Sequence, residues 1–99
     1  MSENITIHSI VAPVECVTWS CIDNEAVLLN LENGFYYTLN EVGCDSWKLM
    51  DARRMLKEIG AELCEIYDVE RQQVEQDLLD LAEELRREKL IAVGGQSTD

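Results

Sequence analysis

The pair Asn33-Gly34 separates two short apolar segments, residues 26–31 and 35–39. Asn-Gly suits the central positions of a two-residue β-hairpin turn, because both residues tolerate a positive φ angle. The two segments are therefore predicted to form antiparallel strands joined by this turn. A two-residue turn would place Leu28 opposite Leu39 across the hairpin.

The remaining chain extends this hairpin at both ends. Residues 14–22 are rich in β-branched and aromatic side chains, which favours a third strand before the hairpin. After it, apolar residues recur at three- and four-residue spacing, which is typical of amphipathic helices. The clearest repeat is Val74, Leu78, Leu81 and Leu85. Helices are predicted over residues 41–51, 55–67 and 69–89, followed by a short strand at 90–93.

The predicted fold is α+β, with a three-stranded antiparallel sheet followed by three α-helices that cover one face. Residues 14–93 would form this domain and residues 94–99 a polar tail. Residues 1–13 are compatible with a flexible N-terminal arm and with an extra edge strand. Trp47, on the first helix, is expected in the core because a tryptophan beneath a sheet buries a large apolar area.

The chain carries a net charge of −12, and its acids are spread along the whole length. Nucleic-acid affinity comes largely from Lys and Arg that replace counterions, so this surface argues against nucleic acid as a partner. The longest apolar run is far below the roughly 20 residues of a membrane span. The N-terminus lacks the features of a signal peptide. We therefore expect a cytoplasmic protein that does not bind membranes.

The sequence offers little material for catalysis or for metal binding. Its four cysteines form no C-x-x-C pair, and His8 is the only histidine. Cys16 and Cys21 would lie roughly 16 Å apart along a strand, too far for a disulfide. We expect reduced cysteines that act as small buried hydrophobic residues. No catalytic residue, metal site or cofactor is predicted.

The third strand, residues 35–39, is the natural open edge of the predicted sheet. It carries no Lys or Pro to prevent pairing with another strand. An extended peptide could add to it through main-chain hydrogen bonds, with the last helix as the apolar wall of a groove. Alternatively, residues 4–12 could cover the edge, or the edge could pair with a second copy in a homodimer.

Three stretches resemble the PqqD family, named for a pyrroloquinoline quinone biosynthesis protein. They are residues 25–31, residues 34–43 with Trp47, and residues 67–91. The resemblance implies a winged-helix-like RiPP recognition element. Such a domain is a peptide-binding chaperone that captures the leader segment of a ribosomally made precursor peptide. It presents the leader to a modifying enzyme, such as a radical S-adenosylmethionine protein, or to a leader peptidase.

By this resemblance, the leader adds as a strand beside residues 35–39 and against the last helix. Backbone pairing would supply affinity, and side chains on the helix would supply selection. The candidate peptide-binding residues are Phe35, Tyr36, Tyr37, Thr38, Leu39, Leu78, Leu79, Ala82 and Arg86. A winged-helix transcription factor is disfavoured, because the last helix carries five acids over residues 75–84.

Overall fold

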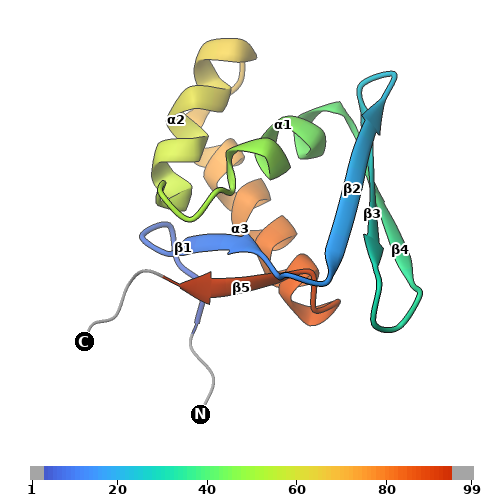
Figure 1. The fold of residues 1–99 in the computed structure, drawn as a ribbon. Coiled ribbons are helices and arrows are strands. Elements are labelled where there is room, and N and C mark those ends of the chain that lie inside the picture. The colour runs from blue at the N-terminus through green and yellow to red at the C-terminus, as the bar shows by residue number, and fades with distance from the viewer. Residues whose placement is uncertain (1–3, 95–99) are drawn as a thin grey trace.

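A computed structural model describes residues 4–94. A three-stranded antiparallel sheet precedes three helices, as predicted, and the helices lie on one side of that sheet (Figure 1). A separate two-stranded sheet, which was not predicted, pairs residues 10–13 with residues 91–94. The elements are β1 (Ile10–Pro13), β2 (Val17–Ile22), β3 (Glu25–Asn30), β4 (Tyr36–Leu39), α1 (Glu41–Leu49), α2 (Leu56–Ile66), α3 (Arg71–Arg87) and β5 (Ile91–Gly94).

The segment left open by the sequence, residues 1–13, contributes a strand. β1 pairs antiparallel with β5, with Val11 opposite Val93. The strand therefore does not cover β4, which was one of the alternatives. Residues 1–3 of the expected arm and residues 95–99 of the expected tail lie outside the described residues.

The register of the β3–β4 hairpin differs from the prediction by two residues. Leu28 lies opposite Tyr37, and the predicted partner Leu39 lies opposite Ala26. The connecting loop spans residues 31–34, so it has four residues where a two-residue turn was expected. A shift of two keeps every side chain on its predicted face, because side chains alternate with a period of two.

Asn30, which is 2% exposed, explains the longer loop. Its backbone N–H donates to the carbonyl oxygen of Phe35 at 2.9 Å and closes the hairpin. Its side-chain Oδ1 accepts from the N–H groups of Glu32 at 2.8 Å and Asn33 at 3.3 Å. Its Nδ2 donates to the carbonyl oxygen of Lys89 at 3.4 Å. One buried amide thus joins the hairpin loop to the segment just after α3.

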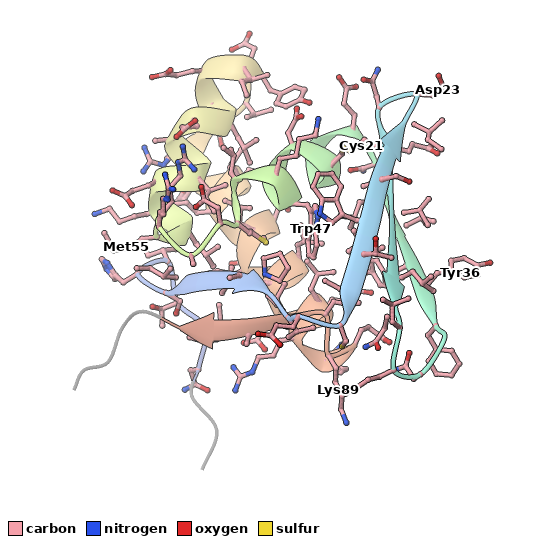
Figure 2. All side chains as sticks on the ribbon, in the orientation of Figure 1. Cys21, Asp23, Tyr36, Trp47, Met55 and Lys89 are labelled. Carbon is pink, nitrogen blue, oxygen red and sulfur yellow. A yellow bond between two sulfur atoms is a disulfide. The ribbon has the colours of Figure 1, made fainter. Side chains whose placement is uncertain are left out.

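The core lies between the inner face of the β2–β3–β4 sheet and the helices (Figure 2). Leu28 supplies a fully buried side chain from the sheet, and Trp47, which is 2% exposed, supplies one from α1. The prediction of Trp47 as a core residue is confirmed. Trp19 on β2 packs edge-to-face against it, with ring centroids 6.3 Å apart, and remains 43% exposed.

The expectation that all cysteines are reduced is wrong for two of them. Cys21 on β2 and Cys44 on α1, 23 residues apart in sequence, form a disulfide. Spacing along the chain does not reveal this pair, because Cys44 reaches Cys21 only when α1 folds back beneath the sheet. Cys16 and Cys64 are free thiols.

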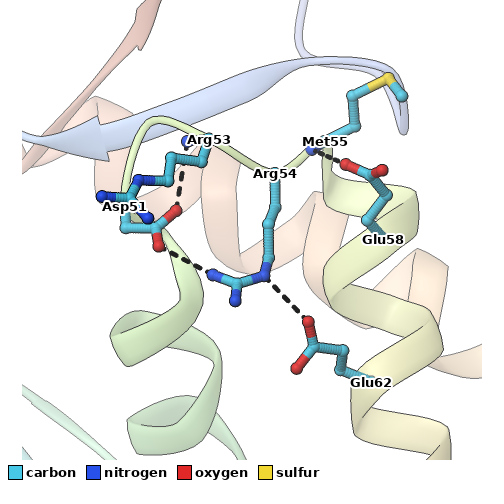
Figure 3. A network of polar contacts seen from close by, with 6 residues as sticks. All are labelled: Asp51, Arg53, Arg54, Met55, Glu58 and Glu62. Carbon is cyan, nitrogen blue, oxygen red and sulfur yellow. Dashed lines mark hydrogen bonds and ion pairs between the residues drawn. The ribbon is translucent and has the colours of Figure 1, made fainter.

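The connection between α1 and α2 is held by a polar network (Figure 3). The guanidinium of Arg54 bridges the carboxylates of Asp51 at 2.7 Å and Glu62 at 2.9 Å. The carboxylate of Glu58 accepts from the backbone N–H of Met55 at 2.8 Å, at the start of α2. These contacts satisfy a free N–H at the helix end and fix the direction in which α2 leaves the loop.

Candidate functional site

The edge of β4 is the structural starting point of the site. The strand order is β2-β3-β4, so β4 pairs with β3 on one side. Within residues 4–94 no other strand pairs with β4. An unpaired edge presents a row of free backbone donors and acceptors, which is a template for a further strand.

The register determines which residues of β4 offer these groups. Residues 30 and 35 form a hydrogen-bonded pair. Because such pairs alternate along an antiparallel ladder, Tyr37 also points its backbone groups toward β3. Tyr36 and Thr38 then point theirs at the open edge. Of the backbone groups expected to pair with a peptide, those of Tyr36 and Thr38 are available and those of Tyr37 are used within the sheet.

Side chains of β4 alternate between two environments. Tyr36, which is 72% exposed, points away from the helices (Figure 2), and Thr38 is exposed on the same face. Leu39 is 5% exposed and belongs to the core. Tyr37 is half-buried on the helix side. Phe35 precedes the strand and is 69% exposed.

Tyr37 identifies the flank of α3 that faces β4. Burial, a hydrogen bond to Glu84 and the negative charges of Glu84 and Glu88 raise the pKa of the Tyr37 phenol to about 12. Counting back along α3 at 100° per residue, Leu81 and Asp77 lie on the same flank as Glu84. The wall beside β4 is therefore largely acidic, with one apolar side chain.

The structure separates the α3 residues predicted as this wall into two groups. Leu78 and Ala82 are buried in the core, at 2% and 0% exposure. Leu79 and Arg86 are half-buried, and they lie roughly 140° and 160° around the helix from Glu84. These two are not brought to β4. The repeat of residues 77, 81, 84 and 88 at helical spacing was the sequence signal for the flank that does face the strand.

A cavity of about 300 Å³ lies where β4 ends and α1 begins. Asn40 follows β4 directly, and its side-chain oxygen accepts from the N–H of Gly43 at 2.9 Å, which caps α1. The cavity lies between the start of α1 and the same flank of α3. It is lined by Asn40, Val42, Gly43, Ser46, Leu63, Val74, Asp77, Leu78 and Leu81.

Strand edge, helix flank and cavity together suit an extended polypeptide. The edge offers main-chain hydrogen bonds, the flank contacts every second side chain of an added strand, and the cavity has room for an apolar group. Among the described residues, no three His, Cys, Asp or Glu side chains are grouped to hold a metal ion. The helices of residues 4–94 include none with the length and apolar character needed to cross a bilayer.

Known proteins give three comparisons. No functionally curated protein matches the chain. A solved structure described as TbiB1 in complex with the TbiA(beta) leader peptide is 33% identical, with a TM-score of 0.75 over 88% of this chain and 99% of that one. A structure described as lasso peptide synthetase B1 complexed with the leader peptide shares the fold at 20% identity, with a TM-score of 0.76 over 84% of this chain and 98% of that one.

The third comparison concerns the family itself. Residues 25–91 match the family model of coenzyme PQQ synthesis protein D, PqqD. The match includes β3, β4, all three helices and the start of β5. It confirms the resemblance read from the sequence, and the chain belongs to the PqqD family.

Proposed function

We propose that this chain binds the leader segment of a ribosomally made precursor peptide by strand addition to β4. The open β4 edge beside α3 is the observation that carries the proposal. Further support comes from TbiB1, which is 33% identical and is described in complex with a leader peptide.

The leader would form a fourth strand of the sheet. The free N–H and C=O groups of Tyr36 and Thr38 would pair with its backbone, which gives affinity for many sequences. Every second leader side chain would then face α3, between Tyr37 and the flank that includes Leu81 and Glu84. At the end of β4 the leader would reach the cavity beside Asn40, which favours an apolar side chain there.

Charge would supply part of the selection. The flank of α3 beside β4 carries Asp77, Glu84 and Glu88, and all three are exposed. A leader with Lys or Arg at the positions that face α3 is favoured, and its affinity falls as salt screens the attraction. A leader that is neutral at these positions binds with little salt dependence.

The role of the chain is to present the leader and not to transform it. The partner would be a separate modifying enzyme, such as a radical S-adenosylmethionine protein, or a leader peptidase. Ribosomal precursor peptides are made in the cytoplasm, which is where we place the protein. The alternative role for the β4 edge is pairing with a second copy of the chain.

A backbone amide NMR titration tests the proposal. The probe is the leader segment of a candidate precursor peptide identified in the source genome, and a scrambled peptide of the same composition is the control. We expect shifts at residues 36–39 and on the α3 flank from Asp77 to Glu84. Shifts confined to other elements would refute strand addition at β4. A shift of β4 that depends on protein concentration, without peptide, would favour the homodimer.

A further inference from the structure

The outer face of the β2–β3–β4 sheet is covered by no helix of the described residues (Figure 1). Strand alternation places on it Thr18, Ser20, Ile22, Glu25, Val27, Leu29, Tyr36 and Thr38. Val27 is 38% exposed and Tyr36 is 72% exposed, and Tyr36 points straight away from the helices (Figure 2). The face is therefore open, and it combines the apolar side chains of Val27, Leu29 and Tyr36 with hydroxyl groups.

The apolar surface continues to the end of the sheet at the β3–β4 loop. Leu31 in this loop is 64% exposed, and Ile22 at the opposite end of the face is 63% exposed. Large exposed hydrophobic groups gathered in one region of a small protein usually mark a contact with another molecule. Strand addition at β4 uses the edge of the sheet and leaves this face unused.

Charge around this face limits what can cover it. Residues 14–39, which include all three strands, contain no Lys or Arg. Their four acids are Glu15, Asp23, Glu25 and Glu32. Each lies at a strand end or in a connecting loop, so the middle of the face is free of charge and both ends are acidic. A second copy would bring the same acids against these ends, which opposes self-association.

We propose that the outer face docks a second protein whose contact surface is apolar at its centre and basic at its rim. The partner that fits is the enzyme that acts on the bound peptide. This assignment rests on the proposed function, because it gives the chain two separate surfaces, the β4 edge for the leader and the outer face for the enzyme.

The β4 edge and the outer face are adjacent, so leader binding at the edge affects enzyme docking on the face. A leader strand added to β4 widens the sheet by one strand. Every second leader side chain then lies beside Tyr36 and Thr38 on the outer face. An enzyme docked there touches both polypeptides at once. Leader binding therefore strengthens enzyme docking, and enzyme docking strengthens leader binding by the same factor.

The test uses the full-length chain with a modifying enzyme or leader peptidase identified in the source genome. Affinity for that enzyme is measured by isothermal titration calorimetry, with and without the leader segment. We expect the leader to increase it at least about fivefold, within the usual range for coupled sites. Val27→Lys should weaken enzyme binding more than about tenfold, because it puts a charge at the apolar centre of the contact. It should leave leader affinity unchanged.

Two control variants match the size and charge of these changes. Ile66→Lys alters an apolar residue on α2 that is 59% exposed and should have no effect on enzyme binding. The double variant Glu25→Lys/Glu32→Lys should weaken docking and flatten its salt dependence, whereas the double variant Glu65→Lys/Asp68→Lys, at two exposed positions around the end of α2, should do neither. If Val27→Lys fails to fold by circular dichroism, the double variant carries the test.

Each outcome decides the proposal. Enzyme affinity that is unchanged in both Val27→Lys and the double variant would overturn it, even if the leader binds normally. Sedimentation that shows a dimer in the parent chain and a monomer in Val27→Lys would also overturn it and make a second copy the occupant. A leader that does not bind at β4 would refute the proposed function alone, because loss of enzyme docking in Val27→Lys would still support the outer face.

Discussion

Replacing Thr38 by proline isolates one main-chain hydrogen bond between β4 and the leader. The backbone N–H of Thr38 points at the open edge and is not used by β3. Proline removes this donor, and it is tolerated on an edge strand where the N–H faces solvent. The variant should therefore keep the fold and lose part of the binding site. The side chain of Thr38 points to the outer face, so its loss can be controlled separately.

The expected loss follows from the bond itself. A main-chain hydrogen bond contributes a net of about 1 kcal/mol, and a leader carbonyl left without a donor costs about 1–3 kcal/mol when buried. Because water can reach the β4 edge and partly satisfy that carbonyl, we expect Thr38→Pro to lose about 1–3 kcal/mol of binding free energy in total. This loss corresponds to roughly 5- to 150-fold weaker binding. Fluorescence anisotropy with a labelled leader segment measures it.

The control is Thr38→Val, which keeps the N–H and removes the hydroxyl. Tyr36→Pro, at the first residue of β4, removes the other outward donor and should weaken binding to a similar degree. Circular dichroism confirms that each variant is folded. Folded Thr38→Pro and Tyr36→Pro variants that bind within twofold of Thr38→Val would refute backbone pairing at this edge.

Three further predictions concern stability. Trp47→Ala should lower the free energy of unfolding by about 3–5 kcal/mol in urea denaturation, because the ring is 2% exposed; a loss below about 1 kcal/mol would contradict its place in the core. Reducing the disulfide between Cys21 and Cys44 should lower the free energy of unfolding by about 3 kcal/mol, because the bond closes a loop of 23 residues and restricts the unfolded chain. A melting midpoint that is unchanged in reductant would contradict this prediction. The phenol of Tyr37 has its pKa raised from 10.0 to about 12 in the folded state, so the unfolded chain releases its proton first and stability should fall between about pH 10 and 12. The pKa of Tyr67 is also raised, mainly by its hydrogen bond to Asp45. Tyr37→Phe should therefore remove only part of the loss of stability, as measured by urea denaturation at a series of pH values across this range.

The elements of the fold could be predicted because each has a local signal. Apolar spacing identified the three helices, and their ends differ from the prediction by at most two residues. The hairpin register was missed because it depends on the side chain of Asn30, which supports a four-residue loop. The disulfide was missed because Cys44 meets Cys21 only once α1 packs under the sheet. The disulfide depends on a contact between distant residues, whereas the longer loop depends on local Asn30 hydrogen bonds that compete with the Asn-Gly turn.

The candidate site could be predicted only in outline. The lack of Lys and Pro in residues 35–39 identified the edge strand. The amphipathic pattern identified α3 as its neighbour, but such a helix has two flanks beside its apolar stripe. The sequence favoured the flank with Leu79 and Arg86, whereas Tyr37 contacts the flank with Glu84. The choice depends on how α3 is rotated against the sheet, which is a property of the packed core.

Asn30 has a consequence for how a peptide would enter the groove. Its amide holds the loop that leads into β4 and also the carbonyl of Lys89 just beyond α3. Strand and helix are therefore held at a fixed spacing before any ligand arrives. Little conformational entropy of the receptor would be lost on binding, so the peptide's own ordering would dominate the entropic cost. The groove is therefore preorganised, and leaders that are already extended in solution should bind most tightly.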